Sequence, residues 1–224
     1  MTILQAIENR NSVRSYLDTE IEKEKLAKLQ SEVDVCNNKG NLSIRLITNE
    51  PKAFENLMAH YGKFKNVKNY IVLIGKKSAN LDERAGYYGE HLVLQAQMLG
   101  LNTCWVALTF SKGAVKQMCN IGNDEKLVCI IALGYGENQG VKHKSKPIEK
   151  ICNYSDDMPQ WFIKGINYAM LAPTAVNQQK FFFTLKDNTV SVKATGGFYS
   201  KVDLGIVKYH FEIGADTDNF SWEN

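Results

Sequence analysis

The chain has 224 residues, of which 44% are hydrophobic and 23% charged, a composition typical of a globular protein with a real core. Its 27 basic and 24 acidic residues give a net charge of +3, which is too small to favour a nucleic-acid binder. Five widely spaced cysteines without a C-x-x-C pair argue against a disulfide framework and a zinc site, and favour a reducing compartment. The N-terminal segment does not resemble a signal peptide and no window is long enough to span a bilayer. We therefore expect a cytoplasmic protein with no bound metal and no membrane partner.

Two helices and a strand are predicted in the first fifty residues. A capping-box pattern at Thr2 opens a short helix over residues 2–10. The same pattern at Thr19 opens a second helix, which should end near residues 37–40, where glycine and asparagine favour a left-handed turn. Alternating apolar and polar residues then predict a half-buried strand.

Continuous apolar runs mark the centre of the predicted core. Residues 69–75 and 126–134 are apolar and of strand length, which predicts strands covered on both faces. Residues 81–100 carry the strongest helical pattern, and Gly100 is suited to its C-terminal cap. A weak helix before residue 60 and a short one over residues 111–119 complete this part.

The pattern repeats on a smaller scale from about residue 155. Residues 158–171 predict a helix, and residues 180–186 and 189–194 predict a hairpin across a two-residue turn. Asp203 is expected to cap a further helix, and the aromatic tail that follows should dock on the protein surface. The predicted class is α+β, with an antiparallel or mixed sheet flanked by helices.

A candidate phosphate-binding stretch lies directly after the first helix. Arg10 and Arg14 supply two guanidiniums, and Ser12 and Ser15 supply two hydroxyls. Guanidinium groups present planar forks of donors to phosphate oxygens and keep their charge at neutral pH. On its own the stretch is better explained as a solvated turn that carries surface arginines, because short basic segments are common and phosphate sites are few.

Four separated segments resemble the FMN-dependent nitroreductases, closest to a short branch with an internally duplicated chain. Residues 10–16 resemble the element that grips the FMN phosphate, and Lys144-Ser145-Lys146 resembles a basic pair that completes it. Residues 100–107 resemble the segment under the isoalloxazine ring, and residues 172–179 resemble a loop that contacts the ribityl chain and the ring edge. The cofactor-binding residues that the resemblance implies are Arg10, Asn11, Ser12, Arg14, Trp105, Val106, Ala107, Leu108, Lys144, Lys146, Pro173, Thr174, Ala175 and Asn177.

The position of the last loop suggests an internal duplication. The family usually carries it soon after the second helix, and residues 34–40 here lack the pattern. Residues 1–154 would then form a first nitroreductase-like half, and residues 155–224 a smaller half that supplies the loop otherwise given by a partner subunit. The resemblance implies a pseudo-dimer with about one FMN per chain, sufficient as a monomer and compatible with a further homodimer.

The implied activity is electron transfer from NADH or NADPH, through bound FMN, to a nitro compound, a quinone or a similar small acceptor. The flavin supplies this chemistry, so we expect no catalytic side chain. One alternative is a flavin-binding or sensing protein without significant turnover. A second alternative, that the lysines of residues 142–150 bind nucleic acid, is weaker because no aromatic residues are interleaved there.

Overall fold

The computed structural model describes residues 1–223, which form two compact units that we describe separately. The large-sheet unit comprises residues 10–81 and 91–142. The small-sheet unit comprises residues 1–9, 82–90 and 143–223. Helix α4 (Leu81–Met98) therefore contributes residues to both.

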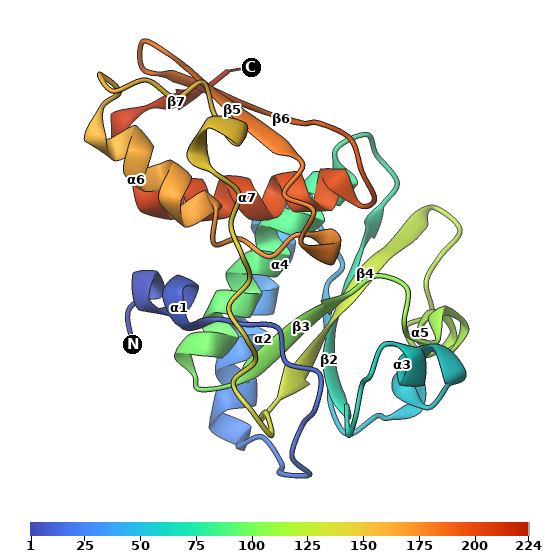
Figure 1. The fold of residues 1–224 in the computed structure, drawn as a ribbon. Helices are drawn as coiled ribbons and strands as arrows, with labels where there is room; N and C mark the ends of the chain where they lie inside the picture. Colours follow the sequence, from blue (N-terminus) through green and yellow to red (C-terminus); the bar gives the residue numbers. More distant parts are fainter. Residues whose placement is uncertain (224) are drawn as a thin grey trace. The chain divides into compact units, whose positions relative to one another are not determined.

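The large-sheet unit is built on four antiparallel strands in the order β1-β2-β4-β3 (Figure 1). Strands β2 and β4 hold the centre and are the two apolar runs that the sequence predicts. The edge strand β1 is shorter than the alternating pattern indicated. The strands are β1 (Arg45–Ile47), β2 (Asn69–Lys76), β3 (Asn102–Val106) and β4 (Glu125–Gly134).

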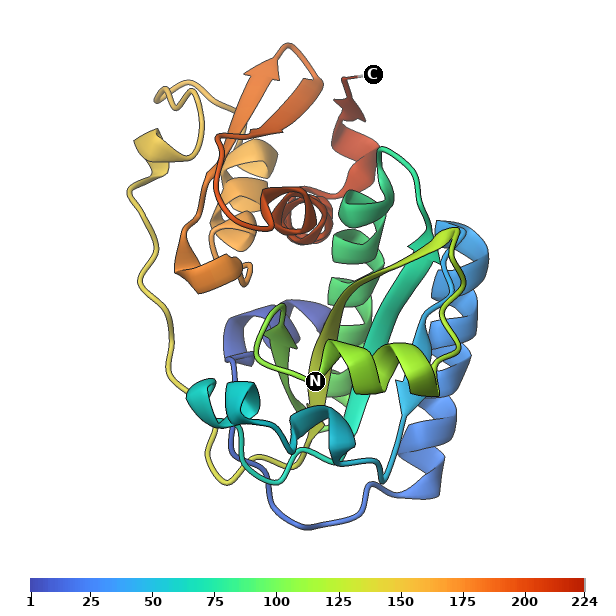
Figure 2. The same ribbon diagram turned by 90° about the vertical axis from the view of Figure 1, so that its right-hand side faces the viewer.

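Helices cover both faces of this sheet (Figure 2). Along β2 the side chains alternate, so Tyr70 and Val72 pack in one cluster with residues of α3 and α5. On the other face, Leu29 of α2 packs with Ala96 of α4 and Leu133 of β4. The covering elements are α2 (Lys23–Gly40), α3 (Leu57–Tyr61), α5 (Lys112–Met118) and the short 3₁₀ turn η1 (Lys52–Phe54).

The small-sheet unit pairs two helices with a small sheet in the order β5-β6-β7 (Figure 1). Helices α6 and α7 lie side by side, and β5 and β6 pack on α7. The hairpin β5–β6 has the predicted two-residue turn. The elements are α1 (Ile3–Asn9), η2 (Ile148–Lys150), α6 (Gln160–Ala169), η3 (Ala175–Asn177), β5 (Phe181–Lys186), β6 (Thr189–Ala194), α7 (Ser200–Ala215), η4 (Thr217–Asn219) and β7 (Ser221–Trp222).

Aromatic rings form the core of the small-sheet unit. The rings of Phe183 and Phe211 stack with centroids 4.8 Å apart, and Phe162 meets Phe211 edge-on. Trp222 donates from Nε1 to Glu212 Oε1 over 2.7 Å, so the aromatic tail docks as the sequence predicted. The C-terminal segment is thereby part of this core.

Two glycines allow α7 to lie against the first half of α4. A Cβ atom added to Gly205 would stand 1.9 Å from the carbonyl oxygen of Glu83. A Cβ atom added to Gly86 would stand 2.0 Å from the carbonyl oxygen of Val202. Neither contact leaves room for a side chain, so backbone meets backbone at this crossing.

The sequence-based expectation for Asp203 was wrong. Helix α7 begins at Ser200, and Asp203 lies one turn inside it, where its side chain bonds a distant loop. A capping pattern in sequence cannot distinguish these two uses of a carboxylate. Every helix in residues 1–223 is too short or too polar to cross a membrane.

The two compact units do not follow the predicted sequence halves 1–154 and 155–224, because residues 1–9 and 82–90 group with the C-terminal segment. The internal duplication itself stays a prediction.

Candidate functional site

The predicted phosphate stretch is attached to β3 by its backbone. The Val13 N–H donates to the Thr103 carbonyl over 3.0 Å, and Ser12 forms a parallel bridge with Thr103. On the other side, the Lys65 N–H donates to the Arg14 carbonyl over 3.0 Å. These bonds fix the main chain and leave the exposed Arg14 side chain available to a ligand.

Three predicted phosphate ligands influence the pKa of one thiol on β3, that of Cys104. Burial raises the pKa of Cys104, which keeps the thiol protonated and fits the role of a small buried hydrophobe. The positive charge of Arg14, a hydrogen bond with Ser12 and the charge of Arg10 act in the opposite direction on that pKa. Ser12 also bridges to Thr103, the neighbour of Cys104 on β3, so the stretch that carries both guanidiniums runs beside this strand. Such a donor set fits a phosphate group.

The predicted ring-side residues follow the end of β3. Val106 is the last strand residue and is buried, whereas Ala107 is half-buried. Leu108 is 48% exposed, which is unusual for a leucine beside a well-packed strand. Trp105 is half-buried, so part of its ring stays accessible. The backbone after β3 is thus surface chain that a planar ligand could approach.

Asn11 has a partner that the sequence did not reveal. Its Nδ2 donates to the Gln139 carbonyl over 3.1 Å, and Asn102 Nδ2 donates to Gln139 Oε1 over 3.0 Å. The structure therefore uses Asn11 to hold the segment after β4.

In the small-sheet unit, the two predicted lysines differ. Lys144 is exposed. The ammonium of Lys146 donates to the carbonyls of Gln178 and Gln179 over 2.7 and 2.9 Å. Lys146 therefore commits two of its three hydrogens to the loop that follows α6, and its role toward phosphate stays a prediction.

That loop, residues 174–179, has an unusual backbone. Val176, Asn177 and Gln179 have φ values of 47°, 53° and 45°, in the left-handed region. A β-branched residue such as valine is a genuine outlier there. Val176 is also 90% exposed. The loop belongs to the segment predicted to contact the flavin, and it has three left-handed residues within four positions.

Asp203 of α7 is the residue that sequence reasoning misjudged most. Its Oδ1 accepts from the Ala175 N–H over 2.9 Å, and its Oδ2 accepts from Gln178 Nε2 over 2.7 Å. The residue is 4% exposed. Burial raises the pKa of Asp203 to about 6, although the two hydrogen bonds partly offset the shift.

The structure also contains a buried polar pair that no sequence pattern indicated. His210 Nε2 lies 2.8 Å from Glu90 Oε1, and neither side chain is exposed. The imidazole Nδ1 lies 3.1 Å from the Tyr168 carbonyl. All three belong to the small-sheet unit, and their role is to join α4, α6 and α7.

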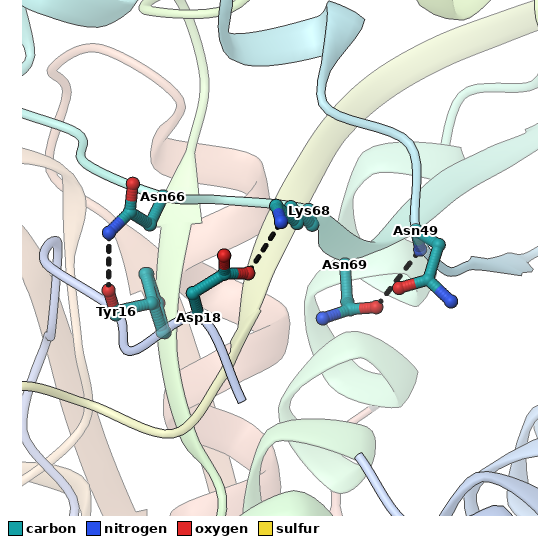
Figure 3. Close-up of polar contacts among 6 residues, drawn as sticks. All are labelled: Tyr16, Asp18, Asn49, Asn66, Lys68 and Asn69. Atoms are coloured by element: carbon teal, nitrogen blue, oxygen red, sulfur yellow. Dashed lines mark hydrogen bonds and ion pairs between the residues drawn. The ribbon is translucent and has the colours of Figure 1, made fainter. Parts of the chain in front are cut away.

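A polar cavity of about 300 Å³ opens in the large-sheet unit, and Tyr16, the last residue of the predicted phosphate stretch, is part of its lining. Figure 3 shows how its side chains are used: Lys68 pairs with Asp18, and Asn66 Nδ2 donates to the Tyr16 carbonyl. Asn69 Oδ1 accepts from the backbone of the neighbouring Asn49 over 3.1 Å. The cavity is lined by Tyr16, Leu17, Asp18, Thr19, Glu20, Asn49, Asn66, Lys68, Asn69, Leu133 and Gly134, and none of the predicted cofactor residues is among them.

Comparison with known proteins agrees with the resemblance seen in the sequence. The family model described as "Putative TM nitroreductase" matches residues 2–215. A structure described as a putative nitroreductase from Thermotoga maritima has 24% identity and a TM-score of 0.67, covering 96% of this chain and 83% of its own.

Two further structures share the fold at lower similarity. An FMN-dependent nitroreductase from Clostridium difficile has 22% identity and a TM-score of 0.51, with 60% of this chain and 88% of that one covered. A putative NADH dehydrogenase/NAD(P)H nitroreductase from Parabacteroides distasonis has 22% identity and a TM-score of 0.54, with 70% of this chain and 98% of that one covered. Among curated proteins, none matches this chain. The fold is thus nitroreductase-like α+β, and the chain belongs to the TM nitroreductase family whose model spans residues 2–215.

Proposed function

We propose that this protein is an FMN-dependent oxidoreductase that takes electrons from NADH or NADPH and passes them to a small organic acceptor such as a nitro compound or a quinone. The observation that carries the proposal is the stretch with Arg10, Ser12 and Arg14, which is bonded to β3 at Thr103, because two guanidiniums and a hydroxyl suit a doubly charged phosphate. Family membership and the FMN-dependent neighbour support the same reading.

FMN, when bound, would supply the two-electron chemistry. The protein's part is to bind and orient it. Arg10 and Arg14 would hold the phosphate, with Ser12 as a further donor, and the N–H of Ala107 or Leu108 would face the ring. Leu108 and Trp105 would give the ring an apolar edge. No side chain needs to move a proton, because the exposed chain after β3 leaves access to solvent.

The proposal is tested by the visible spectrum of the purified protein, followed by heat release and quantification of flavin against chain concentration. We expect a yellow protein with about one FMN per chain. A colourless protein that also fails to bind added FMN would contradict the proposal.

A second measurement separates the enzyme from a flavin-binding protein without turnover. The holoprotein is reduced anaerobically with NADH or NADPH, and a nitroaromatic or a quinone is then added. We expect rapid return of the oxidised flavin spectrum. A flavin that stays reduced, or that neither nucleotide reduces, would favour the sensing alternative.

A further inference from the structure

The loop of residues 174–179 holds a backbone conformation that its own sequence disfavours. A left-handed conformation costs a residue other than glycine on the order of 1–3 kcal/mol, and it persists only where surrounding contacts impose it. Valine at position 176 is an especially poor choice, yet its side chain is 90% exposed and gains no packing from the arrangement. Something outside the loop must therefore impose its shape.

Side chains from two directions impose this shape. From one direction, Lys146 binds the carbonyls of Gln178 and Gln179. The buried side chain of Gln179 adds a bond from its Nε2 to the Lys144 carbonyl over 2.8 Å and accepts from the Lys146 N–H over 2.9 Å. These contacts fix the end of the loop.

From the other direction, the Asp203 carboxylate fixes its beginning. Its two oxygens accept from the Ala175 N–H and from Gln178 Nε2, on either side of Val176. Gln178 Nε2 also donates to the Phe198 carbonyl over 2.7 Å, so the amide cannot rotate without placing its oxygen against another oxygen. Asp203 thus holds both flanks of the strained residue.

This arrangement requires that the carboxylate of Asp203 be buried, which is energetically unfavourable. Asp203 is 4% exposed and has no lysine or arginine among its hydrogen-bond partners, which are an amide N–H and a side-chain amide. A buried carboxylate without a countercharge is a poor stabilising device, since burial disfavours its charged form. Its use here indicates a task other than stability.

We propose that Asp203 is a positioning residue for the cofactor: it holds the loop of residues 174–179 in the strained conformation in which the loop contacts the flavin. This inference rests on the proposed function and adds to it a residue of α7 that lies outside the predicted ligand set. It acts through the loop and does not itself touch the flavin.

The test compares wild type with Asp203→Asn, titrating apoprotein with FMN by quenching of flavin fluorescence. An asparagine can still accept from the Ala175 N–H, but its amide meets the donor amide of Gln178. The loop then spends only part of its time in the binding conformation, and affinity falls by that fraction. We expect FMN to bind about tenfold more weakly, with the thermal midpoint of the apoprotein unchanged or higher.

Hydrogen exchange gives a readout that needs no flavin. The Ala175 N–H donates to Asp203, and the N–H groups of Asn177 and Gln178 donate to carbonyls of the loop itself. In the Asp203→Asn apoprotein these three amide hydrogens should exchange with solvent faster than in wild type. The exposed Asp187 in the β5–β6 turn offers a matched control, since Asp187→Asn makes the same chemical change away from the loop. It should leave both affinity and loop exchange as in wild type.

The outcomes are distinct. Faster loop exchange with unchanged FMN affinity would overturn the positioning role, and so would unchanged loop exchange. A loss of affinity that is matched by a loss of thermal stability would assign Asp203 a merely structural role. Wild-type protein that binds no FMN would instead refute the proposed function. If Asp203→Asn does not fold, Gln178→Leu removes the other half of the same contact and should weaken FMN binding in the same direction.

Discussion

Two segments are predicted to hold the flavin, and the protein builds them in opposite ways. Residues 12–16 are fixed by main-chain bonds to Thr103 and Lys65, which leaves the side chain of Arg14 for a ligand. Residues 174–179 are fixed by side chains from elsewhere, chiefly Lys146 and Asp203, which bond main-chain groups at the two ends of the loop. Binding and stability should therefore be separable at Arg14 and coupled at Lys146. Asp203 differs from Lys146, because burial disfavours its charged form and its replacement by asparagine should weaken binding without loss of stability.

The largest expected effect is the pH dependence that Asp203 imposes on stability. Folding raises the pKa of this carboxyl from 3.8 to about 6, so between these pH values the folded chain keeps a proton that the unfolded chain has lost. The contribution of this protonated carboxyl to the free energy of unfolding is largest below about pH 4 and is lost as the pH rises through 6. Relative to Asp203→Asn, wild type should lose about 2.5 kcal/mol of unfolding free energy between pH 4 and pH 7. Urea unfolding of both proteins across this range measures the difference, and a constant difference would contradict it.

A second substitution tests the separable segment. Arg14→Ala removes a guanidinium whose main chain is held independently, so FMN affinity should fall by about 2 kcal/mol, or roughly 30-fold, at unchanged stability. Titration with FMN and a thermal melt measure the two quantities. Arg45→Ala, which removes an exposed arginine from β1 of the same unit, is the control. Equal losses of FMN affinity in the two variants would mean that Arg14 acts only through the net charge of the protein.

A third substitution tests the coupled segment. Lys146→Ala leaves the carbonyls of Gln178 and Gln179 without their charged donor, and should lower the free energy of unfolding by about 1–2 kcal/mol. The exposed Lys144 provides the comparison, because Lys144→Ala should change the free energy of unfolding by less than about 0.5 kcal/mol. Chemical denaturation distinguishes them. Similar small changes for both would show that Lys146 does not hold the loop.

The smallest effect should come from relieving the strain itself. Val176→Asn places a residue that tolerates the left-handed region at φ 47°, and should stabilise the protein by about 0.5–1 kcal/mol. Val176→Ile keeps the β-branch and serves as the control, with no gain expected. Thermal melts of both proteins measure the gain, and a destabilised Val176→Asn would mean that valine is favoured there by a contact outside the loop.

Much of the fold follows from local pattern. Strands β2 and β4 were predictable because continuous apolar runs bounded by turn residues have few other interpretations. The ends of α2 and α4 were predictable from residues that favour a left-handed turn, among them Gly100, which has a φ of 78°. The predicted capping start at Thr19 was wrong, because α2 begins at Lys23 after Glu22 and has no side-chain cap. The β5–β6 hairpin follows from its turn residues.

The candidate site was predictable only in part. The stretch around Arg14 was found because its residues are adjacent in sequence. The roles of Asp203 and Glu90 were not found, because each side chain meets partners at least 25 residues away, and no local rule identifies such a partner. The strain at Val176 was hidden for a related reason: valine is a residue that local rules place in strands. Local sequence patterns therefore do not predict hydrogen bonds between side chains that are far apart in the sequence.

The three-segment construction of the small-sheet unit has a consequence for its synthesis. Helix α1 packs on α7, and Glu8 accepts a hydrogen bond from the Tyr168 hydroxyl. Translation proceeds at about 5–20 residues per second, so α1 waits on the order of 10–40 s for α7 to emerge from the ribosome. During that interval α1 and residues 82–90 lack the neighbour that covers them. Helix α1 is thus made well before α7, the helix on which it packs.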